Sequence, residues 1–332
     1  MKNRKNTETA KNRLLHLVYG DVTLGVHGNG FDYLFSYQAG GPESFRQGEI
    51  EWLYRAPAPT YWRASTDNDR GSGFPKKSAM WMGADQFPDC KSVKVKVDGK
   101  AEKHFLAPAN NCHNAHEYAS SICITYVYET ATVPKTKTKV SYTVDAAGGI
   151  LVKVHYYGKK GLPQLPVLGL RLVMPALCAG YSYDGLSGET YPDRCAGGIK
   201  GHYDVPGLPV TPYLVPQECG MHVQTTALTV WQETKQKGIY AGFQVEAAGD
   251  APFSFSCLPY TAQELESAYH QEELPLPRRT VLCILGAVRG VGGIDSWGTD
   301  VMKEYQISAE SDIRFQFCMK PLPERRTEKL SM

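Results

Sequence analysis

The stretch SICITYVYE (121–129) decides the fold class of this chain. Large apolar side chains occupy every second position of it, at Ile122, Ile124, Tyr126 and Tyr128. Because successive side chains of a β-strand point to opposite faces, this period of two predicts a strand with one buried face. The same alternation recurs in KSVKVKVDG (91–99), ILVKVHYYG (150–158) and IRFQFCMK (313–320).

Turn signals separate these strands at short spacing, as in DAAGG (145–149) and VPGLP (205–209). One helix start stands out, because Thr261 and Glu264 have the spacing of a capping box. Leu265, Ala268 and Tyr269 are expected to face inward from that helix. The pattern predicts a single all-β domain, an antiparallel sandwich with a few short helices.

Composition excludes several classes of protein. The chain has 332 residues and a formal net charge of +2, which argues against a nucleic-acid partner. We find no apolar run of the length that a membrane helix needs. The five basic residues among positions 1–13 have no apolar run after them, so they do not form a secretory signal. Nine scattered cysteines then indicate reduced thiols in a cytoplasmic protein.

Common catalytic and metal-binding motifs do not fit. GVGGIDSWG (290–298) lacks the Lys-Ser/Thr of a phosphate loop, and GLSGE (185–189) is no nucleophile elbow. Asp67 and Asp69 resemble the start of a calcium loop, but Ser78 stands where its glutamate should be. Cys112, His113 and His116 lack a fourth ligand at suitable spacing for zinc. We therefore predict no metal site on this chain.

Four polar and aromatic segments carry a more specific signal. They are WRASTDNDRG (62–71), YDGLSGETYPDR (183–194), PYLVPQECG (212–220) and GGIDSWG (292–298). In this order and with these separations, together with LGLRLVMP (168–175), they resemble the last domain of the β-galactosidases of glycoside hydrolase family 2. The resemblance covers most of residues 14–320. This sequence contains no counterpart of the sugar-binding jelly roll or the catalytic barrel of those enzymes. The chain is therefore identified as similar to the small subunit of two-chain β-galactosidases.

The resemblance implies a galactose mutarotase-like antiparallel β supersandwich and the retaining hydrolysis of terminal β-galactosides such as lactose. That reaction needs two carboxyl groups about 5–5.5 Å apart. In the family both belong to the barrel, so the resemblance places no catalytic residue on this chain. It implies a heterodimer with a large catalytic subunit. It also implies that magnesium, with sodium as a second candidate, is bound by that subunit and that this chain holds no cofactor.

The resemblance assigns Trp297 to substrate binding, because the matching tryptophan of the family reaches into the active-site pocket. An indole face can stack on the C–H face of a pyranose. Asp295 and Ser296 are expected to orient the loop. From the residues alone, a tryptophan in a glycine-rich turn could equally fill the core.

Segment 61–74 is expected to hold a turn at the active site. Tyr61 and Trp62 would pack into the sandwich, and Asp67, Asn68 and Asp69 would hold a tight non-regular turn by hydrogen bonds to backbone amides. By resemblance, Gly71 begins a mobile loop continued by Ser72 and Gly73. A rigid turn that needs glycine for positive φ remains the alternative.

Three acidic residues inside the motifs are expected to be structural. Glu189, Asp193 and Glu218 would form salt bridges with Arg194 or Arg171 and accept hydrogen bonds from loop backbone. The sequence departs from the family pattern at Ser65, where proline is usual, and at Cys219, where asparagine is usual. The second departure puts the usual contacts of that loop in doubt.

The expected domain spans residues 14–320, between a disordered basic tail (1–13) and a second disordered tail (321–332). Two other functions remain open. A free-standing aldose 1-epimerase-like enzyme would need a histidine acid, for which His155, His202 and His222 are candidates. A non-catalytic galactoside-binding module would bind sugar without a partner.

Overall fold

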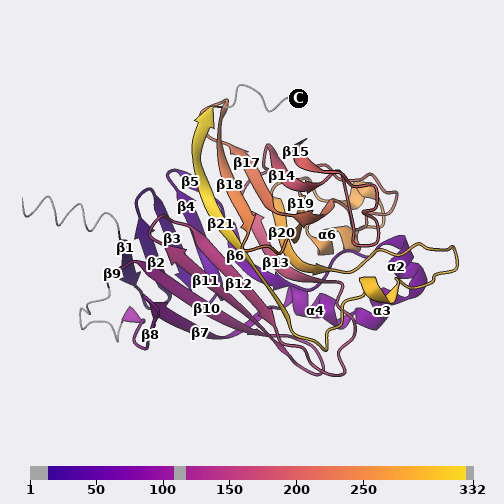
Figure 1. The fold of residues 1–332 in the computed structure, drawn as a ribbon, viewed down its shortest axis with the longest axis horizontal. Coiled ribbons are helices and arrows are strands. Elements are labelled where there is room, and N and C mark those ends of the chain that lie inside the picture. Colours follow the sequence, from indigo (N-terminus) through magenta and orange to yellow (C-terminus); the bar gives the residue numbers. More distant parts are fainter. Residues whose placement is uncertain (1–13, 108–116, 327–332) are drawn as a thin grey trace, which may run out of the picture.

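The computed structural model describes residues 14–107 and 117–326, which form three antiparallel sheets and a few short helices (Figure 1). This architecture confirms the predicted antiparallel β supersandwich with few short helices. The predicted tail at 1–13 lies outside the described residues, as do 327–332 and the candidate zinc ligands Cys112, His113 and His116.

The largest sheet has ten strands in the order β15-β14-β17-β18-β21-β12-β11-β10-β7-β8. Its strands are β7 (Asp89–Val97), β8 (Lys100–Glu102), β10 (Ser121–Glu129), β11 (Lys137–Asp145), β12 (Ile150–Tyr156), β14 (Gly180–Leu186), β15 (Lys200–Pro206), β17 (Ala227–Glu233), β18 (Ile239–Ala247) and β21 (Ile313–Arg326).

Two smaller sheets accompany it. The six-stranded sheet, in the order β5-β4-β3-β2-β1-β9, contains β1 (Leu15–Tyr19), β2 (Thr23–Gly28), β3 (Phe31–Ser36), β4 (Gly41–Gln47), β5 (Ile50–Glu51) and β9 (Tyr118–Ala119). The five-stranded sheet, in the order β16-β19-β20-β13-β6, contains β6 (Arg55–Thr60), β13 (Val167–Met174), β16 (Met221–Thr225), β19 (Phe253–Leu258) and β20 (Thr280–Val288).

The main core lies between the ten-stranded sheet and the two smaller sheets. Phe35 of β3 meets Tyr142 of β11 edge to face, and Phe255 of β19 meets Tyr181 of β14 in the same way. Strand β10 shows why the alternation matters, since its predicted inward residues are all buried: Ile122, Ile124, Tyr126 and Tyr128. The hydrophobic effect of this one-sided burial therefore sets the register of the central strands.

Strand β21 holds the ten-stranded sheet together. It pairs with β12 on one side and β18 on the other, and thereby joins two groups of strands that are otherwise separate in the sheet order. The predicted domain boundary at residue 320 is therefore too early, because residues 321–326 continue this strand instead of beginning a tail.

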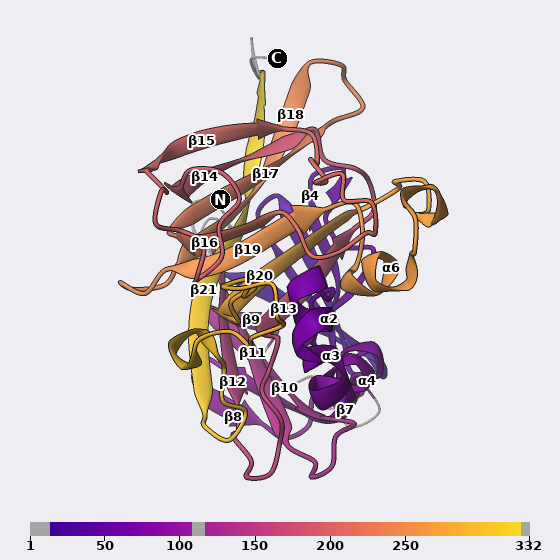
Figure 2. The same cartoon turned by 90° about the vertical axis from the view of Figure 1, so that its right-hand side faces the viewer.

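Three of the short helices were not located from the sequence. A run of three short helices follows β6, namely α2 (Asp67–Ser72), α3 (Phe74–Ser78) and α4 (Met80–Gln86). Further along the chain come α6 (Ala262–Ser267) and the 3₁₀ turns η1 (Gln271–Glu273) and η2 (Lys303–Tyr305). Figure 2 shows α2, α3, α4 and α6 on one side of the molecule.

Helix α6 confirms the predicted start. The side chain of Thr261 accepts a hydrogen bond from the Glu264 amide, and the Glu264 carboxylate accepts one from the Thr261 amide. Leu265 and Ala268 are buried as predicted. The inward prediction for Tyr269 is wrong, because the helix ends at Ser267 and leaves this ring 75% exposed.

Candidate functional site

Helix α2 begins the candidate site, and a capping box fixes its first turn. The Thr66 side chain accepts a hydrogen bond from the Asp69 amide at 3.1 Å, and Asp69 Oδ2 accepts one from the Thr66 amide at 3.0 Å. The prediction that Asp67, Asn68 and Asp69 hold a non-regular turn is therefore wrong. The sequence signal for a helix was present, because Thr66 and Asp69 have capping-box spacing.

Asp69 anchors α2 between two buried arginines. Arg63 Nη1 lies 2.6 Å from Asp69 Oδ2, and Arg289 Nη1 lies 3.1 Å from Asp69 Oδ1. Burial favours the protonated acid, but the charge of Arg63 and its hydrogen bonds outweigh burial and lower the pKa of Asp69. Arg289 also pairs with Asp300, so the ion network reaches the segment that follows Trp297.

The four segments singled out in the sequence converge around α2. Asn68 Nδ2 donates to the Val291 carbonyl oxygen at 3.1 Å, beside the GGIDSWG segment. The Asp67 amide donates to Gln217 Oε1 at 2.8 Å, within the PYLVPQECG segment. Asp193 of the YDGLSGETYPDR segment accepts a hydrogen bond from the amide of Val291 at 2.9 Å. Residues far apart in the chain thus form one polar cluster.

Trp297 lies on a loop beside this cluster, with 92% of its side chain exposed. Asp295 Oδ1 accepts hydrogen bonds from the amides of Trp297 and Thr299, at 3.0 and 3.2 Å. The hydroxyl of Thr299 donates to the other oxygen and lowers the pKa of Asp295. Ser296 is exposed. The alternative that Trp297 fills the core is therefore wrong.

Close packing joins the Trp297 loop to α2. Gly298 has a φ of +78°, and a Cβ atom there would lie 2.6 Å from the carbonyl oxygen of Gly71. Of the three predicted hinge residues, Gly71 and Ser72 belong to α2, while Gly73 has a φ of +71° at the junction with α3. Only Gly73 thus needs the left-handed backbone that glycine adopts without strain.

A cavity of about 260 Å³ opens within the cluster. Its walls come from all four segments and their immediate neighbours, and they are Thr66, Asp67, Asn68, Tyr191, Tyr213, Gln217, Glu218 and Val291. Hydroxyl, amide and carboxyl groups therefore surround a space beside the Trp297 loop. Such groups can exchange hydrogen bonds with a hydroxylated ligand or with a second polypeptide.

Glu218 is the unusual acid of this cavity. Its side chain is buried, and burial raises its pKa to about 8, while the charge of Arg63 opposes the shift. The group is therefore mostly protonated at neutral pH and can donate a hydrogen bond. The predicted salt bridges with Arg171 or Arg194 are wrong, since Arg171 pairs with Asp85 and Arg194 with main-chain oxygens.

The histidines considered for an epimerase have separate partners. His155 pairs with Asp312 at 2.7 Å and His202 with Asp184 at 2.6 Å. His222 is buried beside Tyr181, and burial lowers its pKa to about 4. Within 14–107 and 117–326, no group of three or more His, Cys, Asp or Glu side chains is arranged to hold a metal ion.

The chain is similar over most of its length to the β-galactosidases. It is 35% identical to β-galactosidase BgaC of Bifidobacterium adolescentis over 91% of this chain and 27% of that protein. It is 31% identical to the β-galactosidase of Streptococcus thermophilus over 96% of this chain and 29% of that protein. The chain thus spans less than a third of the length of these relatives.

One form of β-galactosidase polypeptide matches more closely. The β-galactosidase small subunit of Latilactobacillus sakei is 55% identical over 92% of this chain and 98% of that protein. Residues 27–319 match the family described as "Beta galactosidase small chain", and the chain therefore belongs to the β-galactosidase small chain family. The resemblance stated from the four segments is confirmed.

Two solved structures align with most of this chain at low sequence identity. A galactose mutarotase-like protein from Lactobacillus casei has a TM-score of 0.41 and 7% sequence identity, over 90% of this chain and 99% of that chain. A galactose mutarotase related enzyme from Lactobacillus acidophilus has a TM-score of 0.42 and 9% identity, over 93% of this chain and 100% of that chain.

Proposed function

We propose that this chain completes the active site of a large catalytic subunit in a heterodimeric β-galactosidase that hydrolyses terminal β-galactosides with retention. The observation that carries the proposal is the geometry of Trp297. Its indole is 92% exposed, yet its loop is held by Asp295 and packed against α2. An exposed ring on a loop that is held in this way can stack on a sugar bound by another chain, with little loss of conformational entropy.

The residues of this chain would bind and position, while the partner would supply the reacting carboxyl groups. Trp297 would align the pyranose face, and Asp295 and Ser296 would set the loop. Asp67, Asn68 and Asp69 would hold α2 against that loop. In retaining hydrolysis one carboxyl attacks the anomeric carbon and the other protonates the leaving oxygen. Both would lie on the large chain.

Segment Gly71–Gly73 is proposed to move when substrate binds. Its support is the left-handed junction at Gly73 and the direct packing of Gly71 against Gly298, one residue after Trp297. A shift of this segment would therefore displace the tryptophan loop and change how water reaches the site.

The metal and the location of the protein are also proposals. We assign magnesium, with sodium as the second candidate, to the large chain. Eight cysteines of the described residues carry free thiols, which supports a reducing, cytoplasmic setting. Within the described residues, no helix has the length and apolar character needed to span a bilayer.

Mixing the separately purified chains tests the proposal. This chain alone should not hydrolyse a chromogenic galactoside, and activity should appear when the large subunit is added. In the complex, Trp297→Ala should lower kcat/KM by about 5- to 150-fold, the effect of losing about 1–3 kcal/mol of stacking. Phe87→Ala is the matched control, because this ring is 67% exposed and lies outside the site.

Three outcomes would contradict the proposal. Hydrolysis by the isolated chain would place catalytic groups here, and equal kinetics for Trp297→Ala and wild type would exclude stacking. The third outcome is sugar binding by the isolated chain, which calorimetry with galactose and lactose measures. Tight binding by the isolated chain would indicate an independent sugar-binding module, whereas a subunit should bind weakly or not at all. Unchanged thermal stability of Trp297→Ala would show that any kinetic loss is not due to unfolding.

A further inference from the structure

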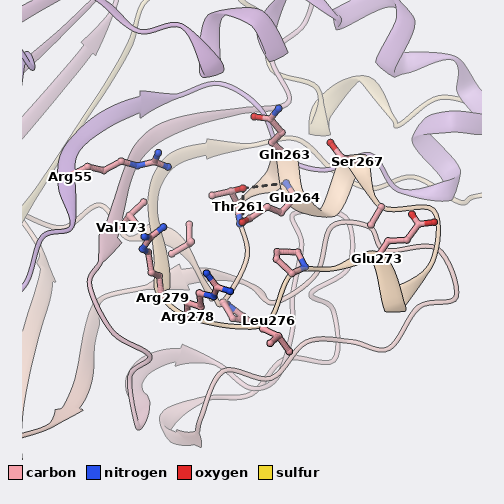
Figure 3. Close-up of a pocket in the computed structure, with 14 residues that line it drawn as sticks. Arg55, Val173, Thr261, Gln263, Glu264, Ser267, Glu273, Leu276, Arg278 and Arg279 are labelled. Atoms are coloured by element: carbon pink, nitrogen blue, oxygen red, sulfur yellow. Dashed lines mark hydrogen bonds between the residues drawn. The ribbon is translucent and has the colours of Figure 1, made fainter.

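Three arginines meet in a second cavity, which we call the arginine cavity. It has a volume of about 630 Å³ and lies between α6, the start of β6 and the segment before β20. Figure 3 shows Arg55, Arg278 and Arg279 along one side of it, with Gln263 and Ser267 on the other. The three cations come from two segments that are distant in sequence and adjacent in space.

These arginines lack the partners that other arginines have. Within the described residues, none of the three side chains forms an ion pair or a hydrogen bond, and that of Arg279 lies over the ring of Tyr54 at 3.5 Å. All other arginines with described side chains pair with a carboxylate or a main-chain oxygen, and they are Arg46, Arg63, Arg70, Arg171, Arg194, Arg289 and Arg314.

The acids in the cavity wall are already engaged. Glu264 Oε2 accepts hydrogen bonds from the amide and hydroxyl of Thr261, at 2.7 and 2.8 Å. Glu273 Oε2 accepts one from the Tyr269 amide at 2.7 Å. Burial and the charges of neighbouring arginines lower the pKa of Arg55, and Glu264 offsets this only in part. Arginine stays charged under these conditions, so the cavity keeps an excess of positive charge.

Shared wall residues link the arginine cavity to the site at α2. A cavity of about 280 Å³ lies between them and shares Pro259 with the arginine cavity. It shares Tyr213 and Gln217 with the polar cavity beside α2. Two large apolar residues are exposed near these cavities. Leu276, 77% exposed, lines the arginine cavity, and Leu214, 90% exposed, directly follows the wall residue Tyr213 in the sequence. We call these three neighbouring cavities, linked by their shared wall residues, the groove.

We propose that the arginine cavity binds an acidic segment of the large catalytic chain. This inference rests on the proposed function, because it assumes that such a chain is the partner. Carboxylates match the planar fork of arginine, and pairing them would neutralise the excess charge. A small anion would leave Leu214 and Leu276 exposed to water, whereas a polypeptide along the groove would cover them. The longer relatives carry over two thirds of their length beyond the part matched here, which indicates a polypeptide occupant.

Titration of the large subunit against variants of this chain tests the inference. Arg278→Gln combined with Arg279→Gln should weaken association by about ten-fold or more, and Arg278→Lys should weaken it less, because it keeps the charge. Wild-type association should weaken as ionic strength rises, and that dependence should be smaller in the double variant. At saturating large subunit, kcat should equal that of wild type, because the cavity touches no reacting group.

The control is Arg46→Gln, an exposed arginine of β4 that pairs with Asp32 outside the groove. Arg46→Gln should leave association with the large subunit unchanged. Because it removes one charge, its matched partner is the single variant Arg278→Gln, which should weaken association. Thermal unfolding of each variant checks that it folds. Association of the double variant equal to wild type would overturn this inference alone. Failure of the wild-type chain to form any complex would overturn the proposed function with it. Saturable binding of inorganic phosphate that requires Arg278, with assembly unaffected, would overturn it in favour of a small-anion site.

Discussion

Glu218 shows how the surroundings of a residue change its chemistry. A glutamate in a polar, proline-rich segment reads as a surface acid, yet this one is buried and its pKa is raised to about 8. The folded state therefore keeps a proton that the unfolded chain loses near the ordinary glutamate pKa of about 4.3. The contribution of this bound proton to the free energy of unfolding is fully present below that pH, and it is lost as the pH rises towards about 8.

Glu218→Gln should remove this pH dependence. The free energy of unfolding of the wild-type chain should fall by a few kcal/mol between about pH 5 and pH 8, because one pKa unit corresponds to about 1.4 kcal/mol. In the variant the fall should be much smaller. Urea unfolding at several pH values measures both. Parallel pH profiles for the two proteins would show that Glu218 is ionised in the folded state.

The loop that carries Trp297 has a local origin in the sequence, whereas the groups around the polar cavity do not. The position of Trp297 follows from a contiguous segment, GGIDSWG, whose glycines and aspartate shape the loop locally. The pKa of Glu218 depends on Arg63 and on burial by segments far away in the chain. Likewise, Asp69 and Arg289 are 220 positions apart, and nothing near either residue signals their contact.

At the scale of elements, local signals decided which predictions succeeded. The alternation of apolar residues predicted the strands correctly, and the capping box predicted the start of α6. Helix α2 has the same kind of box at Thr66, but its short length and its glycine made it read as a turn. The end of α6 was missed because no terminating residue marks Ser267 in the sequence.

The two glycines around α2 should respond in opposite ways to alanine. Gly73 has a φ of +71°, so Gly73→Ala should cost about 1–2 kcal/mol. Gly71 is helical, and an added Cβ would meet only Gly298 Cα at 3.8 Å, so Gly71→Ala should stabilise the helix by about 0.5–1 kcal/mol. Thermal unfolding of the isolated chain measures the change in stability caused by each of the two substitutions.

Kinetics of the complex separate motion from strain. Because we propose that this segment moves, the stiffer Gly71→Ala should change kcat and KM together in the heterodimer. Kinetics equal to wild type, with raised thermal stability, would refute the motion and leave the conformational account of α2 intact.

On the scale of the whole molecule, strand β21 connects two groups of strands that no other described strand joins within the ten-stranded sheet. It lies between β12 and β18 in the ten-stranded sheet. Phe317 and Met319 of this strand are fully buried in the main core. Without it, both neighbours would present open edges, and the core between the sheets would lose its central wall.

Deletion of residues from Ile313 onward should therefore abolish cooperative folding. The truncated chain is expected to lose its sharp thermal transition and to aggregate, because two sheet edges and buried apolar surface become exposed. Circular dichroism melting and light scattering measure these effects. Deletion from Thr327 is the control, since it leaves β21 intact. A cooperative transition in the shorter chain would show that the strand is dispensable.

The place of β21 also sets the order of events during synthesis. Its partner β12 leaves the ribosome more than 150 residues earlier, since Ile150 pairs with Met319. The nascent chain must carry an incomplete sheet until the segment 313–326 emerges, and pairings between such distant residues form slowly. Chaperone binding should therefore be strongest while that last strand is still being translated.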